Sequence, residues 1–239
     1  MGAHKRPKIR GLIMAIHPSL LQQFTLMRLF QTDALASLAA HSSTHAFSKR
    51  EVVLAKENPS PSLMFLLEGR LQAVDFTLDG REVGLHFIEE GQYFGEISVL
   101  DGLPSPEVVI ANKKSQVVMV PAREIRSHIF ASPQAVEAIT SGLTKRIRDQ
   151  SSQRQILGII SPLQRICALL QNLSKDGKNP ELIANAPTHQ EIAMMVNLTR
   201  ETVTRAFQVL QSQGALARDG YDLKVDAGKL KQLAEKSAD

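Results

Sequence analysis

The stretch PTHQEIAMMVNLTRETVTRAFQVLQSQGAL (187–216) predicts two short helices joined by a tight turn. Thr188 and Glu191 have the T-x-x-E spacing of a capping box, in which each side chain accepts a hydrogen bond from the backbone N–H of the other residue. Asn197 suits a turn position with left-handed backbone geometry, because Asn tolerates positive φ better than most residues. Thr199 can cap a second helix. We therefore expect a helix, a short turn at 197–199 and a second helix.

The second helix separates into an apolar and a polar face. Its apolar residues recur at helical spacing, which predicts a face turned to a core: Val203, Ala206, Phe207 and Leu210. The polar residues lie opposite them: Arg200, Glu201, Thr204, Arg205 and Gln208. A helix pair of this kind is a helix-turn-helix, which places its second helix in the DNA major groove, N-terminus first.

The side chains at the start of the second helix have the chemistry needed to recognise bases. Arginine can bond both O6 and N7 of guanine, and glutamate accepts a hydrogen bond from the amino group of cytosine. The candidates for base contacts are therefore Arg200, Glu201 and Arg205. The candidates for phosphate contacts, which set register rather than sequence, are Thr188 and Gln190, with Thr199 as a cap.

A plain helical hairpin with a solvated polar face is the alternative to a DNA-binding unit. The following segment GALARDGYDLKVD (214–226) predicts a strand, an Asp219-Gly220 turn and a second strand, which together resemble a wing. This wing and the cap-turn-cap spacing favour DNA binding.

The sequence pattern before this unit changes from segment to segment. Residues 18–40 predict one or two amphipathic helices. From about 44 to 121, short apolar runs separated by turn residues, among them Asp79-Gly80, predict several strands in a barrel or jelly roll. A polar stretch at 174–187 predicts a loop.

A long helix is predicted after the strands, with Ser132 as its N-cap and Pro133 in its first turn. Its apolar stripe suits either a partner helix or the chain's own β domain, and the pattern does not decide between them: Val136, Ile139, Leu143 and Ile147. We expect an α+β protein made of a leader, a strand-rich domain with N-terminal helices, a long helix and a winged helix-turn-helix domain. The expected bounds are 1–17, 18–131, 132–160 and 161–239.

Composition narrows the classes of protein that fit. The net charge of +4 comes from the leader, since Lys5, Arg6, Lys8 and Arg10 leave 24 basic and 24 acidic residues elsewhere. A single cysteine, Cys167 in an apolar helical pattern, excludes internal disulfides and Cys-ligated clusters and suits a reducing cytoplasm. No stretch approaches the roughly 20 apolar residues of a membrane-spanning helix.

With these features the chain resembles the CRP/FNR family of bacterial transcription regulators. The most specific part is TRETVTRAFQVL (199–210), which is similar to the family's recognition helix, with Arg200, Glu201 and Arg205 at its base-reading positions. The resemblance implies a β-roll sensor, a homodimer formed through 133–158, a palindrome of TGTGA-like half-sites, RNA polymerase as a second partner and a bacterial cytoplasm.

The resemblance also places a phosphate-binding cassette on FGEISVLDGLPSPEVVIA (94–111). Gly95 and Glu96 match the positions that open the cassette helix and bond the ribose hydroxyl. The Arg-Ser clasp of the family is replaced by Ser105 and Pro106, with Glu107 next. The loss of an Arg–phosphate contact costs about 1.5–3 kcal/mol.

Three interpretations of the effector site follow from this departure. In the first, the β-roll binds no nucleotide and serves as a scaffold or as a sensor of something else. In the second, it binds cyclic di-GMP, with cations from Arg146, Arg148 or Arg154. In the third, it binds cyclic AMP in an unconventional way. The polar residues left for a ligand are Ser98 and Ser105, with Ser151 where the family contacts the base.

An enzyme and a metal site are not expected. A cupin-like catalytic barrel needs a cluster of His and Glu ligands on neighbouring strands, and His86 is taken as the only histidine of the strand-rich region. His41 and His45 would share a face of one helix, but no third ligand accompanies them.

Overall fold

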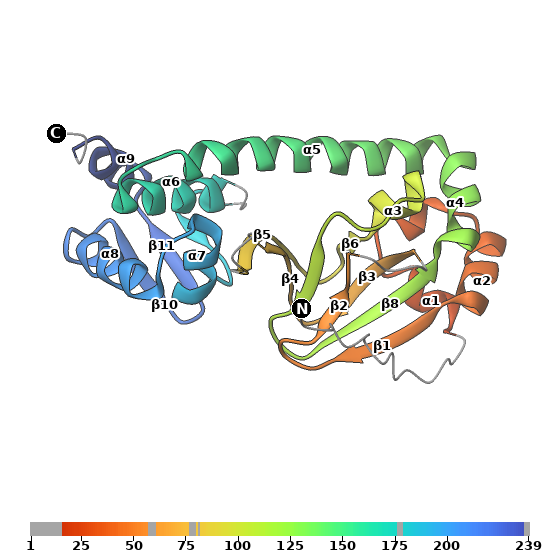
Figure 1. Cartoon of the computed structure of the whole chain (residues 1–239). Coiled ribbons are helices and arrows are strands. Elements are labelled where there is room, and N and C mark those ends of the chain that lie inside the picture. Colours follow the sequence, from red (N-terminus) through yellow and green to blue (C-terminus); the bar gives the residue numbers. More distant parts are fainter. Residues whose placement is uncertain (1–15, 57–60, 77–79, 81, 176–178, 237–239) are drawn as a thin grey trace. The chain divides into compact units, whose positions relative to one another are not determined.

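The computed structural model describes residues 16–56, 61–76, 80, 82–175 and 179–236. The basic leader expected at 1–17 therefore lies almost wholly outside the described residues. The chain divides into two compact units, 1–80 with 85–145 and 81–84 with 146–239. The main division falls inside the long helix α5 (Pro133–Leu157), between Lys145 and Arg146. Figure 1 shows the elements of both units.

Among the described residues, the first unit contains two four-stranded sheets, as the strand-rich pattern predicts. Their strand orders are β1-β8-β3-β6 and β2-β7-β4-β5. The strands are β1 (Ser43–Phe47), β2 (Val52–Leu54), β3 (Ser62–Glu68), β4 (Leu71–Phe76), β5 (Glu82–Ile88), β6 (Tyr93–Phe94), β7 (Val108–Ala111) and β8 (Ser115–Pro121). Of the predicted Asp79-Gly80 turn between β4 and β5, only Gly80 is described, with a φ of 80°.

Both faces of β3 are buried, and this explains its unbroken apolar sequence. Met64 and Leu66 belong to a core cluster between the two sheets. Leu63 and Phe65 belong to a second cluster under the helices, where the rings of Phe24 and Phe65 are 4.7 Å apart. A strand covered on both faces loses the apolar–polar alternation of a half-exposed strand.

The helices over this sheet are shorter than the sequence predicts. Residues 18–40 form α1 (Pro18–Leu21), a 3-10 turn (Met27–Leu29) and most of α2 (Thr32–His41), where one or two amphipathic helices were expected. The Arg28 guanidinium donates to the carbonyl oxygens of Gln22 (2.8 Å) and Gln23 (3.2 Å), which satisfies backbone groups where α1 stops. A further helix, α4 (Ala122–Ala131), follows β8.

Helix α5 begins as predicted, and its apolar stripe divides between two environments. Ser132 Oγ accepts a hydrogen bond from Ala135 N (3.2 Å), with Pro133 as the first helical residue. Ile139 is buried in the core of the first unit and Leu143 packs against it, whereas Ile147 is 67% exposed. The first turns of the stripe therefore pack on the chain's own β domain.

The second unit contains four helices and a three-stranded sheet in the order β10-β11-β9 among the described residues. Its elements are α6 (Pro162–Lys175), β9 (Leu182–Ile183), α7 (His189–Val196), α8 (Arg200–Ser212), β10 (Leu216–Asp219), β11 (Asp222–Val225) and α9 (Ala227–Lys236). The wing hairpin β10–β11 is confirmed. The loop predicted at 174–187 is wrong at β9, a two-residue strand that pairs with β11 and is too short to leave a pattern.

The cassette position Gly95 is fixed by its backbone. It has a φ of 80° and precedes the short helix α3 (Glu96–Asp101). A Cβ at this position would lie 2.7 Å from the Ser62 carbonyl oxygen and 2.9 Å from Met64 Cε. Glycine therefore permits both the left-handed backbone and the close approach to β3.

Replacing Gly95 with Ala is expected to lower the free energy of unfolding by more than replacing Gly91. Both residues have left-handed backbones, but a Cβ at Gly91 meets nothing within 4 Å. Strain at positive φ costs about 1–2 kcal/mol in both variants, and overpacking adds about 1–3 kcal/mol at Gly95 alone. Urea denaturation measures both; equal losses would contradict the packing argument.

Cys167 lies on α6 and is fully buried, as its apolar sequence context predicts. Burial raises the pKa of its thiol to about 11. The reactive thiolate is therefore scarce at neutral pH, and the side chain acts as part of the core.

The native protein is expected to resist a thiol reagent at about pH 8, because a buried thiol with a pKa of about 11 is both protonated and covered. One thiol equivalent should react after denaturation. Fast reaction of the folded protein would contradict the burial of this residue.

Candidate functional sites

The helix-turn-helix is built by the capping groups that the sequence predicts. Thr188 N donates to Glu191 Oε2 (2.7 Å) and Glu191 N donates to Thr188 Oγ1 (3.3 Å), which completes the capping box. Asn197 has a left-handed backbone with φ 50°. Leu198 N donates to the Ala193 carbonyl oxygen (2.9 Å), and Thr202 N donates to Thr199 Oγ1 (3.2 Å). The end of α7 and the start of α8 are thereby fixed.

Helix α8 presents its predicted faces. Its apolar residues are buried: Val203, Ala206, Phe207 and Leu210. The three predicted base-reading residues are exposed: Arg200, Glu201 and Arg205. Thr204 differs from the prediction, because its hydroxyl donates to the Arg200 carbonyl oxygen (2.9 Å) and it also contacts His189 on α7. Thr204 therefore connects α7 and α8, and its side chain is only partly exposed.

Glu201 is held in its ionised form. The pKa of its carboxyl is lowered first by a hydrogen bond from its own backbone N–H, then by one from the Thr199 side chain, and further by the charges of Arg200 and Arg205. An ionised carboxylate only accepts hydrogen bonds, which is the property needed to recognise the cytosine amino group.

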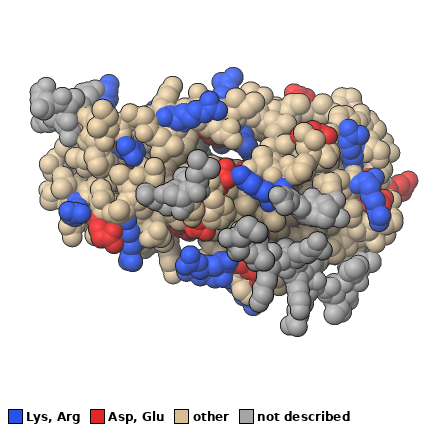
Figure 2. Space-filling model, viewed as in Figure 1, with Lys and Arg blue, Asp and Glu red and all other residues tan. Residues whose placement is uncertain are grey.

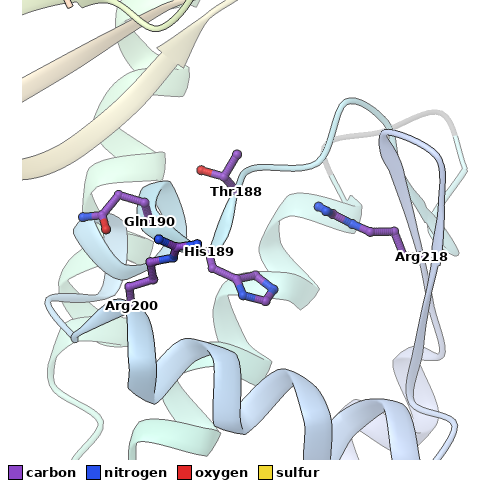
Figure 3. A pocket seen from close by; sticks show the side chains of 5 residues that line it. All are labelled: Thr188, His189, Gln190, Arg200 and Arg218. Carbon is purple, nitrogen blue, oxygen red and sulfur yellow. The ribbon is translucent and has the colours of Figure 1, made fainter.

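A hollow of about 260 Å³ lies beside the start of α7. It is lined by Thr188, His189, Gln190, Arg200 and Arg218 (Figure 3). Two of these were predicted as phosphate contacts and one as a base contact, whereas His189 and Arg218 were not singled out. Arg218 belongs to the wing, so only the folding of β10 beside α7 brings it here.

The wing carries a further charged pair. Lys224 Nζ and Asp219 Oδ2 are 2.8 Å apart across the hairpin. This contact lowers the pKa of Asp219 and raises that of Lys224. Tyr221 at the hairpin tip is 87% exposed.

The predicted effector residues of the cassette lie in the first unit, where they are nearly all buried. Glu96 is 2% exposed, and Ser98 and Ser105 are each 7% exposed. The Ser98 hydroxyl has no hydrogen-bond partner among the described residues. Ser151 is different: it lies on α5 beyond Lys145, in the second unit, and is exposed.

The loop at 105–107, where the sequence predicts a replaced clasp, contains an internal hydrogen bond. The Ser105 hydroxyl donates to the Glu107 carbonyl oxygen (2.8 Å). The Glu107 side chain is buried, with its Oε1 3.9 Å from His86 Nε2 on β5. A buried carboxylate here is unfavourable for an anionic ligand.

The histidines that sequence reasoning considered as ligands are separated. Helix α2 ends at His41 and His45 lies on β1, so the two do not share a helix face. His45 also corrects the expectation that His86 is the only strand histidine. No group of three His, Cys, Asp or Glu side chains suited to a metal ion occurs in the part of the chain that the structure describes.

The surface shown in Figure 2 has Lys and Arg side chains scattered among neutral ones, in keeping with the balanced charge outside the leader. None of the described helices is long and apolar enough to cross a membrane.

The comparisons with known proteins agree with this architecture. Residues 44–132 match the model of the cyclic nucleotide-binding domain, and residues 164–233 match that of the Crp-like helix-turn-helix domain. The chain is 24% identical over 189 residues to the cAMP-activated global transcriptional regulator CRP of Haemophilus influenzae, covering 77% of this chain and 84% of that protein.

Two solved structures share the fold. FixK2 from Bradyrhizobium japonicum has a TM-score of 0.68 and 20% identity, covering 80% of this chain and 96% of that one. The c-di-GMP responsive global regulator CLP of Xanthomonas campestris has a TM-score of 0.62 and 21% identity, covering 82% and 99%. With a nucleotide-binding-type β domain, a long helix and a Crp-like helix-turn-helix domain, the chain belongs to the CRP/FNR family of DNA-binding transcription regulators.

Proposed function

We propose that this chain acts as a homodimer on a palindromic operator with TGTGA-like half-sites, in response to a signal other than ordinary cyclic AMP. The observation that carries the DNA part is the exposure of Arg200, Glu201 and Arg205 along one face of a helix whose start is held by Thr199. These side chains supply the donors for guanine and the acceptor for cytosine that such a half-site needs.

The exposed face of α5 supports a dimer seam. Thr140, Thr144 and Ile147 follow one another at spacings of four and three, and all are exposed. The hydroxyls of Thr140 and Thr144 donate to carbonyl oxygens of their own helix, at 2.8 Å each, so their polar groups need no partner outside it. A second copy of α5 would cover their methyl groups together with Ile147. RNA polymerase is the further partner, in the bacterial cytoplasm.

Selection of bound DNA from a random pool tests the operator, with and without cyclic AMP, cyclic GMP and cyclic di-GMP. We expect enrichment of a palindrome with TGTGA-like half-sites, because a two-fold symmetric dimer presents two copies of α8. A non-palindromic motif would contradict the dimeric arrangement.

Replacing Arg200 or Arg205 with Ala is expected to abolish sequence-specific binding while the fold survives, since both side chains are exposed. A lost bidentate Arg–guanine contact costs about 1–3 kcal/mol in each half-site. Fluorescence anisotropy with operator and unrelated DNA measures the loss of preference. Lys231→Ala is the matched control, an exposed cation of the same unit on α9. Unchanged operator binding in both Arg variants would refute the assignment.

The effector part of the proposal depends on the loop at 105–107. Ser105 is bonded within the loop, Pro106 has no backbone N–H, and Glu107 places a buried carboxylate beside them. A cyclic phosphate would thus lack its usual cation and lie near a buried carboxyl side chain. Cyclic di-GMP is the second candidate, favoured by the exposed cations Arg148 and Arg154 on α5 and by the fold shared with the c-di-GMP responsive CLP.

Titration calorimetry is expected to find weak cyclic AMP binding in the native protein. Ser105→Arg with Pro106→Ser should increase cyclic AMP affinity about ten- to hundredfold, since it restores a charge-assisted contact of about 1.5–3 kcal/mol. Leu103→Arg is the control, because it adds the same charge at a side chain of that loop that is 63% exposed. Tight binding of cyclic AMP by the native protein would overturn this part of the proposal.

A further inference from the structure

His189 is held between the two helices of the DNA-binding unit. Its ring packs on Phe207 of α8, with ring centroids 4.5 Å apart, and its Nδ1 lies 3.0 Å from Thr204 Oγ1. The same ring lines the hollow beside the start of α7 (Figure 3). Its position is therefore fixed by contacts on one side, while it borders open space on the other.

The hydrogen bonds around Thr204 determine which nitrogen of His189 carries the proton when the ring is neutral. The Thr204 hydroxyl donates its one proton to the Arg200 carbonyl oxygen (2.9 Å), which can only accept. Thr204 must therefore accept from His189, so Nδ1 carries the hydrogen. Nε2 is left with a lone pair and becomes a donor only when the ring is protonated. No described residue provides a hydrogen bond to Nε2.

The charged groups that face His189 come from three elements. Arg200 at the start of α8 and Arg218 on β10 line the same hollow, and none of the described carboxylates lines it. On its own helix, the Glu191 carboxylate accepts hydrogen bonds from Thr188. Burial, then Arg218, then Arg200 lower the pKa of His189, so the free protein favours the neutral ring.

We propose that a DNA backbone phosphate enters this hollow and that His189 becomes protonated when it does, so that operator binding takes up a proton in each protomer. The inference rests on the proposed function, since the phosphate belongs to the operator. In the free protein, the charges of Arg200 and Arg218 disfavour a third positive charge on His189. In the complex, the negative charge of the phosphate offsets this repulsion. Protonated Nε2 then donates to a phosphate oxygen in a charge-assisted hydrogen bond.

The sign of the pH effect follows from linkage. DNA raises the pKa of His189, so affinity is lowest above the pKa of the complex and increases as pH falls. It levels off below the lower pKa of the free protein. Within that window one proton per protomer gives up to about tenfold per pH unit, and two protomers up to about hundredfold.

The experiment measures operator affinity by fluorescence anisotropy from about pH 5.5 to 8.5, on both sides of the usual histidine pKa, at constant ionic strength. Calorimetry in buffers of different ionisation enthalpy counts the protons taken up. We expect affinity to increase as pH falls, with net proton uptake. Absence of uptake in a protein that binds its operator would overturn the inference and leave the proposed function standing.

Two variants isolate the residue. His189→Asn keeps an amide donor near Thr204 but cannot be charged, so it should bind at all pH values about as weakly as the native protein at high pH. His189→Arg is always charged, so it should bind tightly at high pH with a flat profile. His41→Gln, an exposed histidine of the other unit, should keep the native slope. A native slope in both His189 variants would refute the role of this residue.

An NMR titration keeps the test independent of any variant. The ring resonances of His189 in the native protein should give a higher pKa in the operator complex than in the free protein. An equal or lower pKa in the complex would overturn the inference. If the folded protein selects no DNA sequence at any pH, the proposed function itself is wrong, and this inference falls with it.

Discussion

Asn197 adopts a left-handed backbone conformation between α7 and α8, and the DNA-facing surface depends on this turn. With φ at 50° at Asn197, the chain turns between the two helices, and Leu198 N donates a hydrogen bond to the Ala193 carbonyl oxygen. The angle between the helices follows from it, and so does the contact of His189 with Thr204. A longer or looser turn would not fix the orientation of α8 relative to α7, so Arg200 and Arg205 would no longer have defined positions.

The β domain depends on a different constraint, the burial of β3 on both faces. One face closes the core between the sheets and the other carries the helices. The cassette is attached to this strand through the close approach of Gly95 to Ser62. Its shape at Gly95 therefore follows from packing against β3 and needs no bound ligand.

The hollow of the helix-turn-helix unit and the cassette of the β domain differ in the side chains that they offer to a phosphate. In the helix-turn-helix unit, two arginines and a histidine border one hollow, and no carboxylate in the described part of the chain lines it. At the cassette, buried Ser105 stands where a cation was expected, and the buried Glu107 side chain follows two residues later. On the proposals made above, the DNA end requires an anion, whereas the sensor end disfavours one, so the signal for this regulator differs in charge or in binding mode from an ordinary cyclic nucleotide.

The sequence by itself determined the helix-turn-helix with its caps, the wing hairpin, the strand-rich domain and the start of α5. These features depend on local rules, namely capping spacing, turn residues and periodicity, which act within a few residues. The family resemblance added the cassette positions. The base-reading roles and the domain bounds stay predictions.

Only the tertiary structure decided which residues meet across elements. Arg218 reaches the start of α7 through strand pairing in the wing, and no spacing in the sequence links it to His189. Thr204, which the sequence places on the polar face, contacts His189 of α7 because the two helices pack together. The stripe of α5 divides because the β domain covers Ile139 but leaves Ile147 exposed. Long-range packing selects among faces that local periodicity leaves equivalent.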